Sequence, residues 1–311
     1  MTAAFVFPGQ GSQAIGMMGG FDAHPVVRAT FAEASDVLGQ DLWALVAEGP
    51  ESELARTVNT QPVMLTAGVA VWRAWQAAGG PAPAVVAGHS LGEYTALVAA
   101  GALAFRDAVP LVRFRAQAMQ DAVPAGVGAM AAILGLDDDG VVAACAEATA
   151  DGQVVEAVNF NAPGQLVIAG HREAVERAIA AAKARGAKRA MLLPVSAPFH
   201  SSLLRPAALQ LAARLAEVQV ATPAIPVLHN VDVGEKRTPA EIRLALAQQA
   251  ASPVRWAATI RSFAARGVTH VVECGPGRVL AGLNKRIVAD LASFALTDGA
   301  AIDATRAALA P

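Results

Sequence analysis

Short apolar runs alternate along the chain with longer stretches in which apolar residues recur every three or four positions. The short runs, rich in β-branched residues, predict buried strands at residues 3–7, 84–87, 226–231 and 268–273. The periodic stretches predict amphipathic helices, for example over residues 26–38 and 107–121. Strands that alternate with helices form parallel sheets. The pattern therefore predicts an α/β protein with a parallel sheet covered by helices on both faces.

The order of elements changes between residues 128 and 193. The pattern here predicts strands at residues 128–134, 154–159, 165–169 and 190–193, with a helix at 137–150 and another before the last strand. This βαββαβ order is that of ferredoxin-like folds. Because the flanking segments are both of the α/β type, we predict a small ferredoxin-like subdomain, residues 127–195, inserted into a large hydrolase-like subdomain, residues 1–126 and 196–311. A cleft is expected between the two.

The composition is that of an enzyme-sized globular protein. The 311 residues are 54% apolar, which suffices to bury a large core. A formal net charge of -2 and a pI near 6.3 give no general attraction for nucleic acid. Cys145 and Cys274 are far apart and lack neighbouring metal ligands, so neither a disulfide framework nor a metal site is expected. We expect buried free thiols in a reducing cytosol.

Two features argue against export and membrane insertion. Pro8 and Gly9 interrupt the first apolar run, and no basic region precedes that run, which is unlike a signal peptide. The longest apolar stretch, residues 94–105, is too short to span a bilayer. The sequence therefore predicts a cytoplasmic protein with no membrane partner.

The strongest local signal is Gly88-His89-Ser90-Leu91-Gly92. It follows a predicted strand and precedes a helical stretch, which is the context of the nucleophile elbow in hydrolase-like sheets. In such a turn the serine adopts a strained backbone conformation, and the flanking glycines avoid clashes. The serine hydroxyl then projects at the helix N-terminus, where the Leu91 N–H faces any oxyanion that forms. Ser90 is therefore the candidate nucleophile.

An unactivated serine is a poor nucleophile, so a base is needed, and the chain has six histidines. His89 is expected to point away from Ser90 across the turn. Four others have no distinguishing neighbours and are expected to be structural or exposed: His24, His171, His229 and His270. His200 lies in an irregular stretch directly after the last strand of the small subdomain, which places it at the cleft. His200 is therefore the candidate base.

The loop after the first strand, Pro8-Gly9-Gln10-Gly11-Ser12-Gln13, allows two interpretations. With Ala14 in third place, it formally matches the glycine fingerprint of dinucleotide-binding proteins. That fingerprint needs a second strand ending in an acidic residue, but Glu33 and Asp36 fall inside a helical pattern. We therefore favour a glycine loop at the carboxyl end of a strand, in which the backbone N–H of Gln10 supplies a second oxyanion donor.

Arg115 shares one face of a predicted helix with the apolar residues Leu111 and Met119, at four-residue spacing. A guanidinium on an apolar stripe either extends its stem to reach water or binds a partner. The second interpretation predicts a bidentate clamp for a substrate carboxylate.

Taken together, the sequence resembles the malonyl-CoA:acyl carrier protein transacylases, relatives of polyketide acyltransferase domains, over essentially its whole length. The blocks that carry the resemblance are Phe7-Pro8-Gly9-Gln10-Gly11-Ser12-Gln13, Gly88-His89-Ser90-Leu91-Gly92-Glu93-Tyr94, Arg115 with Met119-Gln120, Asn159-Phe160-Asn161-Ala162-Pro163-Gly164-Gln165, Ala197-Pro198-Phe199-His200, Pro253-Val254-Arg255-Trp256 and Glu273-Cys274-Gly275-Pro276-Gly277.

The resemblance implies a role for each candidate residue. Ser90 would be the acylated nucleophile, His200 its base, and Arg115 the residue that holds the free carboxylate of the substrate. The backbone N–H groups of Gln10 and Leu91 would form the oxyanion hole.

Four further assignments rest on the resemblance alone. The family orients its histidine with a main-chain carbonyl, and the matching position is Gln249. Asn161 would line the cleft near the thiol of the carrier, Phe199 would crowd an α-methyl group, and Met119 would line the substrate pocket.

The implied reaction carries a malonyl group from malonyl-CoA to the phosphopantetheine thiol of acyl carrier protein, through a malonyl-serine in ping-pong order, and supplies fatty-acid synthesis. It requires no cofactor, and we expect a monomer. The alternatives are the malonyl transferase of a malonate decarboxylase system, a serine esterase or thioesterase, and a non-catalytic subunit that docks a carrier protein. A thioesterase would need an acidic residue before the histidine, which is not identifiable in the sequence, and would leave Arg115 without a role.

Overall fold

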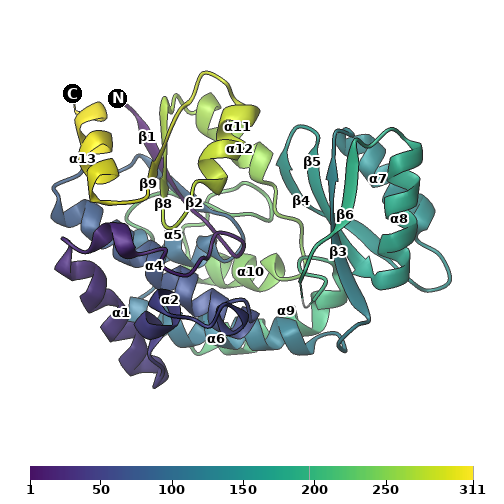
Figure 1. The fold of residues 1–311 in the computed structure, drawn as a ribbon, viewed down its shortest axis with the longest axis horizontal. Coiled ribbons are helices and arrows are strands. Elements are labelled where there is room, and N and C mark those ends of the chain that lie inside the picture. The colour runs from purple at the N-terminus through teal and green to yellow at the C-terminus, as the bar shows by residue number, and fades with distance from the viewer. Residues whose placement is uncertain (196, 311) are drawn as a thin grey trace.

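The chain is organised around two β-sheets that lie side by side (Figure 1). We call the part built on the five-stranded sheet the large body and the part built on the four-stranded sheet the small body. The computed structural model describes residues 1–195 and 197–310. The five-stranded parallel sheet has the order β7-β2-β1-β8-β9 and consists of β1 (Ala3–Phe7), β2 (Val85–Gly88), β7 (Val227–Leu228), β8 (His270–Cys274) and β9 (Ala292–Leu296). The four-stranded antiparallel sheet has the order β4-β5-β3-β6 and consists of β3 (Gly128–Leu134), β4 (Val155–Ala162), β5 (Gln165–His171) and β6 (Arg189–Leu192).

Helices cover both faces of the parallel sheet and one face of the antiparallel sheet. Those of the large body are α1 (Pro25–Leu38), α2 (Leu42–Ala47), α3 (Glu51–Leu54), α4 (Thr57–Ala77), α5 (Gly92–Ala99), α6 (Phe105–Asp121), α9 (Arg205–Ala216), α10 (Pro239–Gln249), α11 (Trp256–Ala265), α12 (Val279–Ile287) and α13 (Gly299–Ala308), with short 3-10 helices at Gly19–Phe21 and Ser202–Leu204. The antiparallel sheet carries α7 (Asp138–Ala148) and α8 (Arg172–Ala184). In the described part of the chain, every helix is too short or too polar to cross a membrane.

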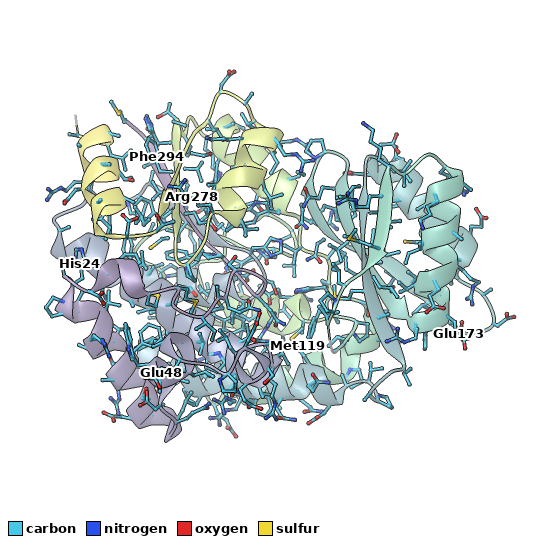
Figure 2. The ribbon with its side chains drawn as sticks, in the orientation of Figure 1. His24, Glu48, Met119, Glu173, Arg278 and Phe294 are labelled. Atoms are coloured by element: carbon cyan, nitrogen blue, oxygen red, sulfur yellow. The ribbon has the colours of Figure 1, made fainter. Side chains whose placement is uncertain are left out.

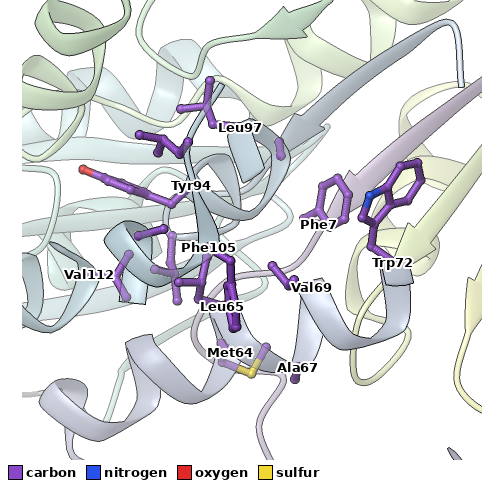
Figure 3. Close-up of a cluster of buried hydrophobic side chains, with 14 of the residues drawn as sticks. Phe7, Met64, Leu65, Ala67, Val69, Trp72, Tyr94, Leu97, Phe105 and Val112 are labelled. Carbon is purple, nitrogen blue, oxygen red and sulfur yellow. The ribbon is translucent and has the colours of Figure 1, made fainter. Parts of the chain in front are cut away.

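The parallel sheet is buried on both faces because side chains alternate along each strand. On β1, Phe5 and Phe7 pack into the larger core, which contains residues of α4, α5 and α6 (Figure 3). Ala4 and Val6 face the opposite side, where α11 and α12 supply the apolar side chains. The α/β architecture with a parallel sheet and helices on both faces is therefore confirmed.

The antiparallel sheet is covered by helices on one face only. Ile133 and Leu166 pack against α7 and α8, together with the buried free thiol of Cys145. The other face carries Met130 and Val167, which pack with Phe199 at the edge of the large body. An apolar sheet face is thus turned toward the other body. In Figure 2, Met119 of α6 lies between the two bodies.

Backbone pairing fastens the small body to the large one. The Phe160 N–H donates to the Val254 carbonyl at 3.0 Å, and the Val254 N–H donates to the Val158 carbonyl at 2.8 Å. The N–H of Ser202, two residues after His200, also donates to the Glu156 carboxylate at 2.6 Å. The predicted boundary of the small subdomain falls at Ser196, which lies outside the described residues.

Most strands occur close to their predicted positions, with two exceptions. The strand predicted at 226–231 ends at Leu228, because His229 and Asn230 leave the sheet to bond Glu93. The last strand, β9, was not predicted, since its residues Ala292–Leu296 are mostly half-buried and form only a weak apolar run.

Candidate active site

Ser90 lies at a sharp turn between β2 and α5. Its φ of 52° is in the left-handed region, which a serine rarely adopts and which costs about 1–2 kcal/mol. The turn is tight: a Cβ on Gly88 would lie 1.8 Å from the Gly92 carbonyl carbon, and one on Gly92 would lie 2.0 Å from the Phe7 carbonyl oxygen. Neither position leaves space for a side chain, which explains the spacing of the two glycines.

The Asn230 side chain stabilises this strained turn through two hydrogen bonds to its backbone. The Ser90 N–H donates to Asn230 Oδ1 at 2.8 Å, and Asn230 Nδ2 donates to the Gly88 carbonyl at 2.7 Å. These two hydrogen bonds hold both ends of the turn. Sequence reasoning missed Asn230, which lies 140 positions from Ser90.

The structure brings Ser90, His200 and Gln249 into a line of hydrogen bonds. Ser90 Oγ lies 2.7 Å from His200 Nε2, and His200 Nδ1 lies 2.9 Å from the Gln249 carbonyl oxygen. Because a carbonyl oxygen only accepts, Nδ1 carries the proton and Nε2 faces Ser90 with its lone pair. This is the arrangement in which a histidine can take the serine proton.

Electrostatics keep His200 neutral. Burial lowers its pKa to about 3, the charge of Arg115 acts in the same direction, and the hydrogen bond to the Gln249 carbonyl opposes both. At pH 7 the imidazole is therefore uncharged and available as a proton acceptor.

Arg115 is buried on α6, with only 1% of its surface exposed. Nη1 donates to Gln61 Oε1 at 2.7 Å, and Nη2 donates to Gln249 Oε1 at 2.9 Å and to Ser90 Oγ at 3.2 Å. These partners are all neutral, and Nε has no hydrogen-bond partner in the described part of the chain. A buried guanidinium without a directly bonded counter-ion is suited to receive an anionic group.

A cavity of about 500 Å³ between the two bodies joins these groups. The candidate residues that line it are Gln10, Ser90, Leu91, Arg115, Met119, Asn161, Phe199 and His200, together with Met130 and Val167 from the antiparallel sheet. Gln249 lies behind the cavity wall, where it contacts His200 and Arg115. All nine predicted site residues thus lie at this cavity or directly behind it.

The loop after β1 packs against the elbow. A Cβ on Gly9 would lie 2.6 Å from the His89 carbonyl oxygen and 3.7 Å from the Leu91 nitrogen, so only glycine allows this approach. The loop does not open a helix as the dinucleotide fingerprint requires, since the next α-helix begins at Pro25. The backbone N–H groups of Gln10 and Leu91 make no hydrogen bond within the described residues, which leaves both free for an oxyanion in the cavity.

Comparison with known proteins identifies the family. Residues 4–310 match the acyl transferase domain family. The chain belongs to this family. It is 57% identical over 302 residues to the malonyl CoA-acyl carrier protein transacylase of Escherichia coli K12, covering 97% of each, and 45% identical to that of Bacillus subtilis 168, covering 96% of this chain and 95% of the relative.

Solved structures of similar proteins have the same fold. The acyl-carrier-protein S-malonyltransferase of Burkholderia pseudomallei is 62% identical, with a TM-score of 0.97, and covers 99% of this chain and 100% of its own. A malonyl-transacylase in complex with a type II polyketide synthase acyl-carrier protein is 53% identical, with the same TM-score of 0.97 and the same coverage of 99% and 100%.

His89 has a more specific place in this acyl transferase than its sequence context suggested. Its Nε2 lies 2.8 Å from Asn161 Oδ1 on the antiparallel sheet, and its ring packs on Trp256 at 5.5 Å. The ring thus contacts Asn161 and Trp256, and it lines the same cavity as Ser90. Burial lowers the pKa of His89, so it is uncharged there at neutral pH.

A buried polar network beneath the elbow was not predicted. Glu93, on the first turn of α5, is fully buried and accepts hydrogen bonds from His229 Nδ1 at 2.8 Å and from the Asn230 N–H at 2.9 Å. Gln249 Nε2 donates to the same carboxylate at 3.0 Å. His229 is thus a buried structural histidine next to the active site. The partners are 136 or more positions apart, so no local pattern could have connected them.

Proposed function

We propose that this chain transfers the malonyl group of malonyl-CoA to the pantetheine thiol of acyl carrier protein through a malonyl-Ser90 intermediate. The observation that carries the proposal is the buried Arg115, whose Nη2 lies 3.2 Å from Oγ of the nucleophile Ser90 and which bonds no carboxylate among the described residues. A pocket for an uncharged acyl group would have no use for this cation. The similarity over nearly the whole chain to transacylases that bear this name supports the same conclusion.

In the first half-reaction, His200 Nε2 takes the Ser90 proton while Oγ attacks the thioester carbonyl carbon. The oxyanion of the tetrahedral intermediate is held by the backbone N–H groups of Gln10 and Leu91, each worth about 3 kcal/mol in such a site. The C–S bond then breaks, and the CoA thiolate takes the proton from His200. In the second half-reaction, His200 removes the proton of the pantetheine thiol, whose sulfur attacks the ester carbonyl carbon. The bond between that carbon and Ser90 Oγ then breaks, and Oγ takes the proton back from His200.

The remaining assignments rest on the family resemblance and on the position of these residues at the cavity. Arg115 pairs with the malonyl carboxylate, Met119 and Phe199 bound the acyl group, with Phe199 crowding any α-methyl group, and Asn161 lies near the incoming thiol. The steps use only serine, histidine, arginine and backbone groups, so the proposal includes no cofactor. Since both carriers of the malonyl group belong to the interior of the cell, the proposed location is the cytoplasm.

The subdomain organisation forms part of the proposal. The parallel sheet with a serine elbow is of the hydrolase-like type, and the order β4-β5-β3-β6 supports a ferredoxin-like small subdomain. We propose the boundaries 1–126 and 196–311 for the large subdomain and 127–195 for the small one.

Mass spectrometry of the intact protein after exposure to malonyl-CoA tests the function. The expected product is a persistent malonyl adduct that maps to the peptide containing Ser90, and that is discharged when holo acyl carrier protein is added. The Ser90→Ala variant is the control and should acquire no adduct. Release of free malonate without an adduct would instead indicate a thioesterase, and transfer by the Ser90→Ala variant would refute the proposed nucleophile.

A further inference from the structure

Gln249 contacts each of the three reactive residues, His200 and Arg115 through their side chains and Ser90 through its backbone carbonyl. Its carbonyl accepts from His200 Nδ1 at 2.9 Å, its Oε1 accepts from Arg115 Nη2 at 2.9 Å, and its Nε2 donates to the Ser90 carbonyl at 2.9 Å. The backbone contact with His200 does not depend on the side chain. The contact with Arg115 does, because the amide must present oxygen and not nitrogen to a guanidinium that only donates.

An amide side chain has two orientations of nearly equal shape. If the Gln249 amide turned by half a rotation, its NH₂ group would face the Arg115 donors and its oxygen would face the Ser90 carbonyl. Some fixed group must exclude this orientation. The Ser90 carbonyl and the Glu93 carboxylate are both such groups, because each accepts from Gln249 Nε2, at 2.9 Å and 3.0 Å, and neither has a hydrogen to donate. Of the two, only Glu93 is a side chain that can be replaced.

Glu93 is itself held in place. It is fully buried on α5, with Oε1 bonded to His229 and Oε2 bonded to the Asn230 N–H. Its orientation is therefore determined by groups that do not touch the cavity.

We infer that Glu93 is a positioning residue: it fixes the Gln249 amide so that Oε1 faces Arg115 and thereby holds the guanidinium where it meets the carboxylate of the substrate. This inference rests on the proposed malonyl transfer. It predicts that Glu93 acts on the choice of acyl group, since the Ser90–His200 pair is oriented by the Gln249 backbone.

Two conservative variants separate this role from a general need for buried charge. In Glu93→Gln, the side chain keeps its length, and its amide oxygen can take the place of Oε2 and accept from Gln249 Nε2 and the Asn230 N–H. The new NH₂ group then faces His229 Nδ1, which can accept if its proton moves to Nε2, an atom that has no partner among the described residues. In Glu93→Asp, the charge stays, but the carboxylate withdraws by about 1.5 Å and leaves hydrogen-bond range of Gln249.

The measurement is the ratio of kcat/KM for malonyl-CoA to that for acetyl-CoA, with holo acyl carrier protein as acceptor, accompanied by thermal unfolding. We expect Glu93→Asp to lower the ratio about tenfold with acetyl transfer retained, and Glu93→Gln to stay close to the unmodified protein. An unchanged ratio in Glu93→Asp, a parallel loss for both substrates, or an equal loss of the ratio in both variants would overturn the inference.

A second comparison uses Gln249→Met, which removes the amide but keeps the carbonyl that orients His200. We expect this variant to lower the malonyl to acetyl ratio, and Glu93→Asp added to it to cause no further decrease. Additive losses would mean that Glu93 acts by another route and would overturn the inference. If the unmodified protein transferred no malonyl group at all, the proposed function itself would fail, which is a different result from any of these.

Discussion

Replacing Arg115 by methionine removes the charge of the proposed carboxylate clamp while keeping most of the side-chain volume. In the structure, Nη2 lies 3.2 Å from Ser90 Oγ, so a carboxylate bound to the guanidinium is held within a few bonds of the acylated oxygen. A hydrogen bond to a charged partner contributes about 1.5–3 kcal/mol, which is roughly a ten- to hundredfold effect on kcat/KM. We therefore expect malonyl-CoA transfer to fall by that factor in Arg115→Met.

Transfer from acetyl-CoA is expected to behave differently. Acetyl-CoA has no carboxylate to lose, and the charge of Arg115 is one of the causes that lower the pKa of His200. Removing that charge makes His200 a stronger base, so acetyl transfer should be unchanged or faster. The ratio of malonyl to acetyl transfer should thus decrease because malonyl transfer falls, while acetyl transfer does not.

The assay is the initial rate of acylation of holo acyl carrier protein from each thioester, with unfolding temperature recorded for each variant. Arg115→Lys provides the matched control, because it keeps the charge but lacks the forked donor geometry, and an intermediate loss is expected. Equal losses with malonyl-CoA and acetyl-CoA in a folded Arg115→Met variant would refute the assignment of Arg115 as the clamp.

Three further predictions concern the base, a buried carboxyl and the elbow. Because the pKa of His200 is about 3, the rate of Ser90 malonylation should stay constant between pH 5 and 8 and fall only as the pH approaches that value, which rapid-quench mass spectrometry can follow; a decline centred near pH 6.5 would contradict it. Burial raises the pKa of Glu273 to about 7 from 4.5, so the folded state holds its proton longer than the unfolded state, and stability is lost as the pH rises through this window, by about 3 kcal/mol. Denaturant unfolding of Glu273→Gln should show this part of the pH dependence removed, whereas the same slope in both proteins would disprove it. Gly92→Ala places a methyl group 2.0 Å from the Phe7 carbonyl and should lower the unfolding temperature sharply, while Gly282→Ala on α12, with open space around the new Cβ, should raise it slightly; equal effects would refute the steric argument.

The parts of the site that sequence could predict are local or are marked by their position in the order of elements. The elbow is encoded within five residues, since the positive φ of Ser90 and the contacts of Gly88 and Gly92 all arise in one turn. His200 could be placed at the cleft because it follows the last strand of the small sheet. The βαββαβ order likewise emerged from the alternation of strand and helix patterns.

The groups that hold these residues in place were beyond sequence reasoning. Glu93, His229 and Asn230 meet only after the chain has folded around the parallel sheet, and none of them belongs to a motif that names its partner. The carbonyl of Gln249 was located through family resemblance. Every residue has a backbone carbonyl, so the residue type does not indicate which one bonds the histidine. In physical terms, the reactive groups are specified locally, whereas their orientation depends on long-range burial.

The way His200 is oriented bears on why transfer to a thiol should prevail over hydrolysis. In the described residues, its Nδ1 faces a neutral carbonyl and not a carboxylate, so the imidazolium that forms in catalysis has no bonded counter-ion, and its basicity stays low. A weak base takes a proton more readily from a thiol, whose pKa is about 8.5, than from water, whose pKa is about 15.7. The Ser90 hydroxyl is as weak an acid as water, but it is held 2.7 Å from His200 Nε2, whereas a water molecule would first have to be positioned there. Burial and the charge of Arg115, which the hydrogen bond to the neutral Gln249 carbonyl offsets only in part, therefore keep His200 a modest base and favour the survival of the malonyl ester on Ser90 until a pantetheine thiol arrives. A carboxylate at the position of the Gln249 carbonyl would strengthen the base and shift the site toward the chemistry of a thioesterase.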